Sequence, residues 1–247
     1  MNNIVILSSS LCLWDYDESG NRIPKNFGNN NELLDNFKKY IKRYDNFLFV
    51  ASSEIDTEIT DMYAKNTFAS FDLTLPFTNY QILDIRTEHN CDELIKNADF
   101  IYLCGGHVPT QNSFFAKIGF KDKLKDSNAL IVGASAGSMN CARKVYCPPE
   151  LEGESLDYNF KRYIDGLALT DINILPHYSD EKDSILDGKR FIEDIVLPDS
   201  YNTCIYAISD GDYILVNGEE NILYGEAYKI ENGNINLISK KQGGTIL

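Results

Sequence analysis

The chain has 247 residues, of which 43% are hydrophobic and 24% charged, a composition typical of a globular protein with a full core. Its formal net charge of −14 and sequence pI near 4.6 exclude nucleic acid and anionic membrane surfaces as expected partners, because both would repel the protein at long range. No apolar stretch approaches the roughly 20 residues of a membrane-spanning helix, which excludes membrane insertion.

Short apolar stretches alternate with amphipathic segments along the first half of the chain. In chain order, the pattern predicts a strand at 3–7, a helix at 33–41, a strand at 47–51, a helix at 57–71, a strand at 81–85, a short helix at 92–96, a strand at 100–104, a helix within 111–125 and a strand at 129–133. Strands that are apolar throughout and alternate with helices are typical of a parallel sheet covered on both faces. The predicted fold class is α/β, with a largely parallel sheet.

The pattern changes after residue 135. Residues 147–155 are acidic and rich in turn formers, which predicts a surface loop. We then expect a strand at 172–175, a helix from about 184 to 195, and short C-terminal strands separated by Asp-Gly and Asn-Gly turns. No repeat or low-complexity linker divides the chain, so we expect a single domain over residues 1–247.

The cysteines and the N-terminal residues indicate in which cellular compartment the protein is expected. The six cysteines are scattered without a CxxC pair or another zinc spacing, and the N-terminus has no signal-like basic and apolar segment. We therefore expect a cytoplasmic protein with free thiols. Neither a metal nor an organic cofactor is expected.

The most informative motif is Gly-x-Ser-x-Gly at Gly133, Ser135 and Gly137, which follows a predicted strand and precedes a helical segment. Small residues on both sides of a serine allow a sharp turn from strand to helix, which exposes the hydroxyl above the sheet. The same turn brings backbone N–H groups close to the hydroxyl, where negative charge develops during acyl transfer. The pattern arises by chance in roughly one chain of this length in ten, but less often in this context. Ser135 is therefore the predicted nucleophile.

A serine hydroxyl needs a general base, and the chain has only three histidines. His177 follows the strand predicted at 172–175, so it should lie at a strand end on the same rim as Ser135. His107 belongs to a Gly-Gly-His loop that suits an oxyanion hole better than the base, because paired glycines permit close backbone approach. His89 has no distinguishing neighbour and is expected on the surface. The favoured base is His177.

A carboxylate must hold the imidazole in its useful tautomer. Four candidates crowd the acidic loop, and the residues alone do not choose among them. They are Glu150, Glu152, Glu154 and Asp157.

With these motifs in place, the chain resembles the serine peptidase family that includes aspartyl dipeptidase (peptidase E) and cyanophycinase, whose fold is similar to class I glutamine amidotransferases. The matching segments are 101–107, 133–140 and 171–178, with weaker similarity at 207–212. Their order and approximate spacing agree with the family, which makes three segments far more specific than one motif.

The resemblance implies a role for each matching position. Ser135 would be the nucleophile, His177 the base, and the backbone amides of Gly106 and Ala136 the oxyanion hole. The family's acidic residue lies some fifteen residues past the serine, which points to Glu150, with Glu152 and Glu154 as rivals.

The substrate specificity of the family does not carry over in the same way. Aspartyl dipeptidases read the acidic side chain with a basic residue after the catalytic histidine, and residues 180–190 align poorly with that motif. Lys182, Lys189 or Arg190 could serve instead, or each could be a solvated charge.

The sequence thus predicts a serine hydrolase that acts on short peptides through a Ser-His-Glu triad and an acyl-enzyme. Two alternatives stay open: a non-peptidase ester or amide hydrolase using the same site, and a non-catalytic binding protein with an amidotransferase-like fold. A small peptide is the expected partner, and the sequence leaves a homodimer open.

Overall fold

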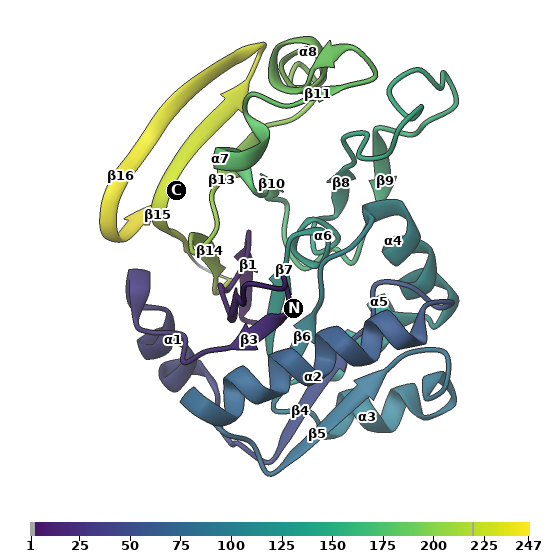
Figure 1. Cartoon of the computed structure of the whole chain (residues 1–247), viewed down its shortest axis with the longest axis vertical. Coiled ribbons are helices and arrows are strands. Elements are labelled where there is room, and N and C mark those ends of the chain that lie inside the picture. The colour runs from purple at the N-terminus through teal and green to yellow at the C-terminus, as the bar shows by residue number, and fades with distance from the viewer. Residues whose placement is uncertain (1–2, 219) are drawn as a thin grey trace.

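A computed structural model describes residues 3–218 and 220–247 and places one large sheet at the centre of the molecule (Figure 1). One half of this sheet is parallel. In spatial order its strands are β1 (Val5–Ser8), β7 (Leu130–Ala134), β6 (Phe100–Leu103), β4 (Asn46–Val50) and β5 (Asn79–Leu83). All neighbours in this set are parallel, so the carboxyl ends of these strands share one edge.

Helices cover both faces of the parallel half. The helices are α1 (Leu33–Tyr40) and α2 (Thr57–Thr74) on one face, and α3 (Cys91–Asn97), α4 (Val108–Lys117) and α5 (Phe120–Lys123) on the other. Alternate residues of β4 point to opposite faces: Phe47 packs in the cluster that contains α1 and α2, and Leu48 in the other. Both side chains are fully buried, which explains why the strands are apolar throughout. The predicted α/β class is confirmed.

The second half of the sheet is mostly antiparallel. Its strands are β14 (Tyr213–Val216), β15 (Asn221–Glu231), β13 (Ile205–Ile208), β10 (Asn173–Leu175) and β16 (Asn234–Ile246). β14 pairs with β1, and β16 pairs along β15. β14 and β13 pair with successive parts of β15, at 221–224 and 227–230, while β10 lies parallel to β13.

This pairing makes β1 and β10 run toward each other. β14 is antiparallel to β1, β13 continues the line of β14 along β15, and β10 follows the direction of β13. The carboxyl ends of β1 and β10 therefore meet near the β13–β14 turn at 209–212. The sequence-based expectation of a common rim thus holds, but β10 reaches it from the opposite direction.

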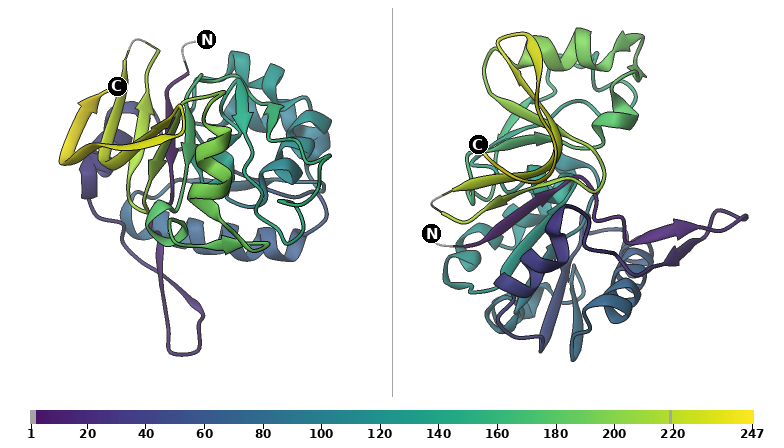
Figure 2. Two further views of the ribbon diagram at one scale, coloured as in Figure 1. Left: turned by 90° about the horizontal axis from the view of Figure 1, so that it is seen from above. Right: turned by 90° about the vertical axis from the view of Figure 1, so that its left-hand side faces the viewer.

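The remaining elements are short. They are β2 (Trp14–Tyr16), β3 (Arg22–Pro24), η1 (Asn30–Glu32), η2 (Glu88–Asn90), η3 (Leu124–Asp126), α6 (Ala136–Met139), β8 (Lys144–Tyr146), β9 (Tyr163–Asp165), α7 (Tyr178–Glu181), β11 (Ile185–Leu186), β12 (Lys189–Arg190), the π-helix η4 (Phe191–Val196) and α8 (Leu197–Asp199). Figure 2 shows the β2–β3 hairpin projecting from the body of the molecule. None of the described helices combines the length and the apolar character needed to cross a bilayer.

Two predicted helices differ in the structure. The helix predicted within 111–125 is divided into α4 and α5 by Gly119, which has a left-handed φ of 63°. The helix predicted from 184 to 195 is wrong over its first half, where β11 and β12 form a small hairpin. Asp187 and Gly188 both have positive φ and supply the two-residue turn, because Asp-Gly favours that geometry. The predicted helix becomes the π-helix η4 over 191–196.

Candidate active site

Ser135 occupies a sharp turn between β7 and α6. Its φ of 50° and ψ of −117° lie outside the regions favoured by non-glycine residues. The Ser135 N–H donates to the carbonyl oxygens of Ser8 and Ser9 at 3.0 and 2.9 Å, which ties the turn to the end of β1. Such strain costs on the order of 1–3 kcal/mol and persists only where the surroundings impose it. The predicted elbow geometry is therefore present.

The glycines of the motif are required because the backbone on both sides of Ser135 packs against its neighbours. A Cβ on Gly137 would lie 2.2 Å from the Leu103 carbonyl oxygen, and a Cβ on Gly133 would lie 2.5 Å from Ser138 Cα. Both neighbours are backbone atoms of packed elements and cannot rotate away. The two glycines hold α6 tightly against β6 and β7.

We expect Gly137→Ala to lower the free energy of unfolding by about 3 kcal/mol or more, since overpacking against backbone forces the elements apart. For a chain of this size, the melting temperature should fall by roughly 6–12 °C in a thermal denaturation experiment. Gly28→Ala is the matched control, because nothing lies within 4 Å of a Cβ at that position. Equal melting temperatures for the two variants would contradict the proposed tight packing.

His177 follows β10 and lies at the meeting point of β1 and β10. Its Nδ1 lies 2.7 Å from Asp210 Oδ1, on the β13–β14 turn. An ionised carboxylate only accepts hydrogen bonds, so Nδ1 carries the proton and Nε2 is left free for a proton from elsewhere. Burial disfavours the imidazolium, but the hydrogen bond and charge of Asp210 outweigh it, and the pKa of His177 is raised above its ordinary value.

Ser9 connects His177 and Asp210. Its Oγ donates to Asp210 Oδ1 at 2.6 Å and accepts from the backbone N–H of His177 at 2.7 Å. Ser9 is fully buried directly after β1. Burial alone would raise the pKa of Asp210, but the hydrogen bonds from His177 and Ser9 lower it by more. The pKa of Asp210 therefore lies below its ordinary value, and the carboxylate stays ionised at neutral pH.

The carboxylates of the acidic loop do not make this contact. Glu154 instead bonds His107, with its Oε1 at 2.9 Å from His107 Nε2, and its Oε2 accepts from the backbone N–H groups of Glu150 and Leu151. Glu152 and Asp157 are exposed. The expected partnership of His177 with Glu150 therefore does not match the geometry, because Asp210 occupies the position at Nδ1.

Glu150 points into the same cavity as the serine and the histidine. Desolvation and the neighbouring Glu154 charge raise the pKa of Glu150 to about 7, against a hydrogen bond from the Val108 N–H that lowers it. Its carboxylate is therefore partly protonated at neutral pH.

The Gly-Gly-His loop lies against Ser135. A Cβ on Gly105 would lie 3.3 Å from Ser135 Cβ, and a Cβ on Gly106 would lie 2.5 Å from Ser52 Cβ. Gly105 therefore lets the loop backbone approach Ser135 closely, and Gly106 lets it pack against Ser52. Ala136 is buried as the first residue of α6, and His89 is exposed.

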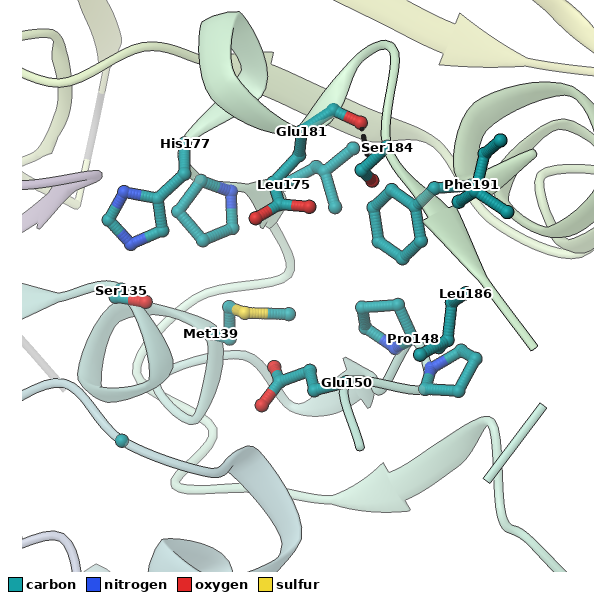
Figure 3. Close-up of a pocket in the computed structure, with 14 residues that line it drawn as sticks. Ser135, Met139, Pro148, Glu150, Leu175, His177, Glu181, Ser184, Leu186 and Phe191 are labelled. Carbon is teal, nitrogen blue, oxygen red and sulfur yellow. Dashed lines mark hydrogen bonds between the residues drawn. The ribbon is translucent and has the colours of Figure 1, made fainter. Parts of the chain in front are cut away.

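Ser135 and His177 face one cavity of about 330 Å³ (Figure 3). The lining residues are Gly106, Ser135, Met139, Pro148, Pro149, Glu150, Leu175, Pro176, His177, Glu181, Ser184, Ile185, Leu186 and Phe191. Figure 3 shows the serine and the histidine at one end, and Leu186 and Phe191 at the other. The structure thus brings together Ser135, His177, Gly106 and Glu150 from four separate segments.

Two residues of this arrangement were missed by the sequence reasoning. Asp210 lies in the 207–212 segment, whose similarity to the family is weak and implies no role for a particular residue. Ser9 lies in a run of three serines after the first strand, where no pattern distinguishes it.

Comparison with known proteins identifies the family of the chain. The family model named Peptidase family S51 matches residues 19–224 of the chain. The chain belongs to peptidase family S51. This S51 chain is therefore a serine-type peptidase, a hydrolase similar to peptidase E. No curated protein matches its sequence.

Solved structures show the same fold. One is a protein from Listeria monocytogenes EGD-e provisionally assigned as a peptidase E; it is 19% identical, has a TM-score of 0.58, and the match covers 96% of this chain and 99% of the other. Another is a peptidase from an acI-B1 Actinobacterium, 14% identical with a TM-score of 0.67, covering 97% and 95% of the two chains. The S51 peptidase therefore shares the architecture of these proteins.

Proposed function

We propose that this S51 peptidase cleaves short peptides with Ser135 as nucleophile, His177 as general base and Asp210 as the carboxylate that orients the base. The proposal rests on one observation: the hydrogen-bonded chain Ser9–Asp210–His177 ends at the cavity that holds Ser135 on its strained turn. Asp210 replaces Glu150 as the third member, because the Nδ1 partner determines the tautomer.

In the proposed reaction, His177 Nε2 takes the hydroxyl proton of Ser135 as its Oγ attacks the peptide carbonyl. The carbonyl oxygen becomes an oxyanion, which the backbone N–H groups of Gly106 and Ala136 would stabilise by about 3 kcal/mol each. His177 then gives the proton to the leaving amine, and an acyl-enzyme forms on Ser135. Water, deprotonated by the same histidine, hydrolyses the ester and restores the hydroxyl.

The cavity supports a short substrate. Its volume of about 330 Å³ lies at the lower end of the range for ligand pockets, which favours a small ligand such as a short peptide. The loop between β8 and β9, which carries Pro148, Pro149 and Glu150, forms one wall.

The pH dependence tests the base. Because the reaction needs neutral His177, and because the pKa of His177 is raised, kcat/KM should fall on acidification around a midpoint above the ordinary histidine value. Asp210→Asn should move this midpoint to lower pH, since the charge that stabilises the imidazolium is lost.

Glu150, whose pKa is raised to about 7, could also produce an acidic limb and needs a control. Glu150→Gln removes its titration, and the acidic limb measured on an uncharged substrate should persist. If Glu150→Gln lost the acidic fall in kcat/KM and Asp210→Asn left its midpoint unchanged, that fall would belong to Glu150. His177 would then be refuted as the base.

A further inference from the structure

Apart from His177, the charged groups that line the catalytic cavity are negative. Glu150 and Glu181 contribute carboxylates, and no lysine or arginine is among the lining residues. Among the described residues, no cationic side chain forms an ion pair with either carboxylate. A substrate with an acidic side chain would meet repulsion here rather than a counter-charge.

None of the three cations that could bind an acidic side chain of the substrate lines the cavity. Lys189 Nζ donates to the Ser155 carbonyl oxygen at 2.7 Å. The Arg190 guanidinium bonds both oxygens of Asp194, at 3.0 and 2.7 Å. Lys182 is exposed after α7 and does not line the cavity. None of the three is therefore in place to bind a carboxylate beside Ser135.

The two carboxylates stand on opposite walls of the cavity. Figure 3 shows Glu181 on the wall that carries His177 and Glu150 on the facing wall, both between the Ser135 end and the apolar end. Glu181 comes from α7, directly after the catalytic histidine, and Glu150 from the β8–β9 loop. Phe191 and Leu186 supply apolar surface beyond them. A group held here would have a cation between two carboxylates and carbon chain against the apolar wall.

We propose that the S51 peptidase selects substrates whose acyl residue, the one that becomes attached to Ser135, carries a positive charge that Glu150 and Glu181 bind. The charge is an ammonium or guanidinium group, which has two sources in a peptide: the free α-amino group and a basic side chain. This specificity rests on the proposed function, because it takes Ser135 as the point of attack.

The surroundings of Glu150 agree with a cationic ligand. The charged groups around it are Glu154, Glu181 and His177. Desolvation and the charges of the two glutamates raise the pKa of Glu150, so that it holds a proton more readily. A bound cation would favour the ionised form and displace that proton. The KM of a cationic substrate should therefore fall as pH rises through about 7, whereas the KM of an uncharged substrate should not.

The test compares near-isosteric dipeptides on the full-length enzyme. Lys-Leu against norleucyl-Leu measures the side-chain charge, and norleucyl-Leu against its N-acetyl form measures the α-amino group. We expect at least one pair to differ by about tenfold or more in kcat/KM in favour of the cation, and Glu-Leu to be the poorest substrate. Glu150→Gln and Glu181→Gln should each reduce that preference, and Glu93→Gln, on the exposed side of α3, should not.

A second measurement does not depend on turnover. Lysine amide, norleucine amide and N-acetylnorleucine amide are compared as protectors of Ser135 against a neutral fluorophosphonate probe. The charge selectivity would be overturned if both pairs differed by less than threefold in kcat/KM and in protection of Ser135. It would also be overturned if a glutamyl ligand gave better protection and turnover, in both cases while Ser135 still reacts with the probe. Absence of labelling at Ser135 would instead refute the proposed function, and the two failures are therefore distinguishable.

Discussion

Replacing Ser135 by alanine is expected to lower kcat/KM by about 10⁴-fold or more, because the variant has no hydroxyl to form the acyl-enzyme. The remaining activity would come from binding and from oxyanion stabilisation alone. The fold should be unaffected, since the side chain of Ser135 is not needed for the backbone hydrogen bonds that hold the turn. The measurement is steady-state hydrolysis of a dipeptide panel, with circular dichroism to confirm folding.

The control for this variant is Ser113→Ala. Ser113 lies exposed on α4, and its hydroxyl donates to the Pro109 carbonyl oxygen within its own helix. It should retain wild-type turnover and should label with a fluorophosphonate at Ser135. Wild-type turnover in the Ser135→Ala protein would show that another group carries the reaction.

Replacing Asp210 by asparagine is expected to slow the reaction of Ser135 by about 10²–10⁴-fold. Asparagine keeps the shape of the side chain but removes the charge, so it neither stabilises the imidazolium nor holds the proton on Nδ1. The second-order rate of labelling by a neutral fluorophosphonate reports this effect directly, because a neutral probe is insensitive to the charge of Glu150 and Glu181. Ser9→Ala should slow labelling less, since the direct bond between His177 and Asp210 remains.

The matched comparison is Glu150→Gln. It should label at nearly the wild-type rate, because Glu150 makes no hydrogen bond to the histidine ring in the geometry of the site. Slow labelling of Glu150→Gln together with fast labelling of Asp210→Asn would return the orienting role to the acidic loop and refute Asp210.

Local sequence determined most of the first half of the fold. The apolar strands at 47–51 and 100–104 are predictable because both faces of the sheet are covered, so no polar residue interrupts them. The same holds for the turn at Ser135, since only glycine fits at positions 133 and 137, where a Cβ would lie within 3 Å of neighbouring backbone atoms. Asp187-Gly188 is an equally local turn signal, which the helix predicted from 184 to 195 wrongly spans.

The acidic member of the site was not accessible in this way. Candidate carboxylates were plentiful in the loop at 150–157, and their distance along the chain from Ser135 said nothing about their distance from His177. Asp210 lies 33 residues past the histidine, and only the pairing of β13 with β10 brings the β13–β14 turn to the imidazole.

The sequence by itself determined the α/β class, the nucleophile turn and the histidine that follows a strand, because each depends on residues that are neighbours along the chain. The tertiary structure decided which carboxylate meets His177, that Ser9 joins them, and that the described residues lining the cavity include two glutamates but no lysine or arginine. These depend on β1 and β10 meeting end to end, an arrangement set by strand pairing along β15 between residues far apart in the sequence.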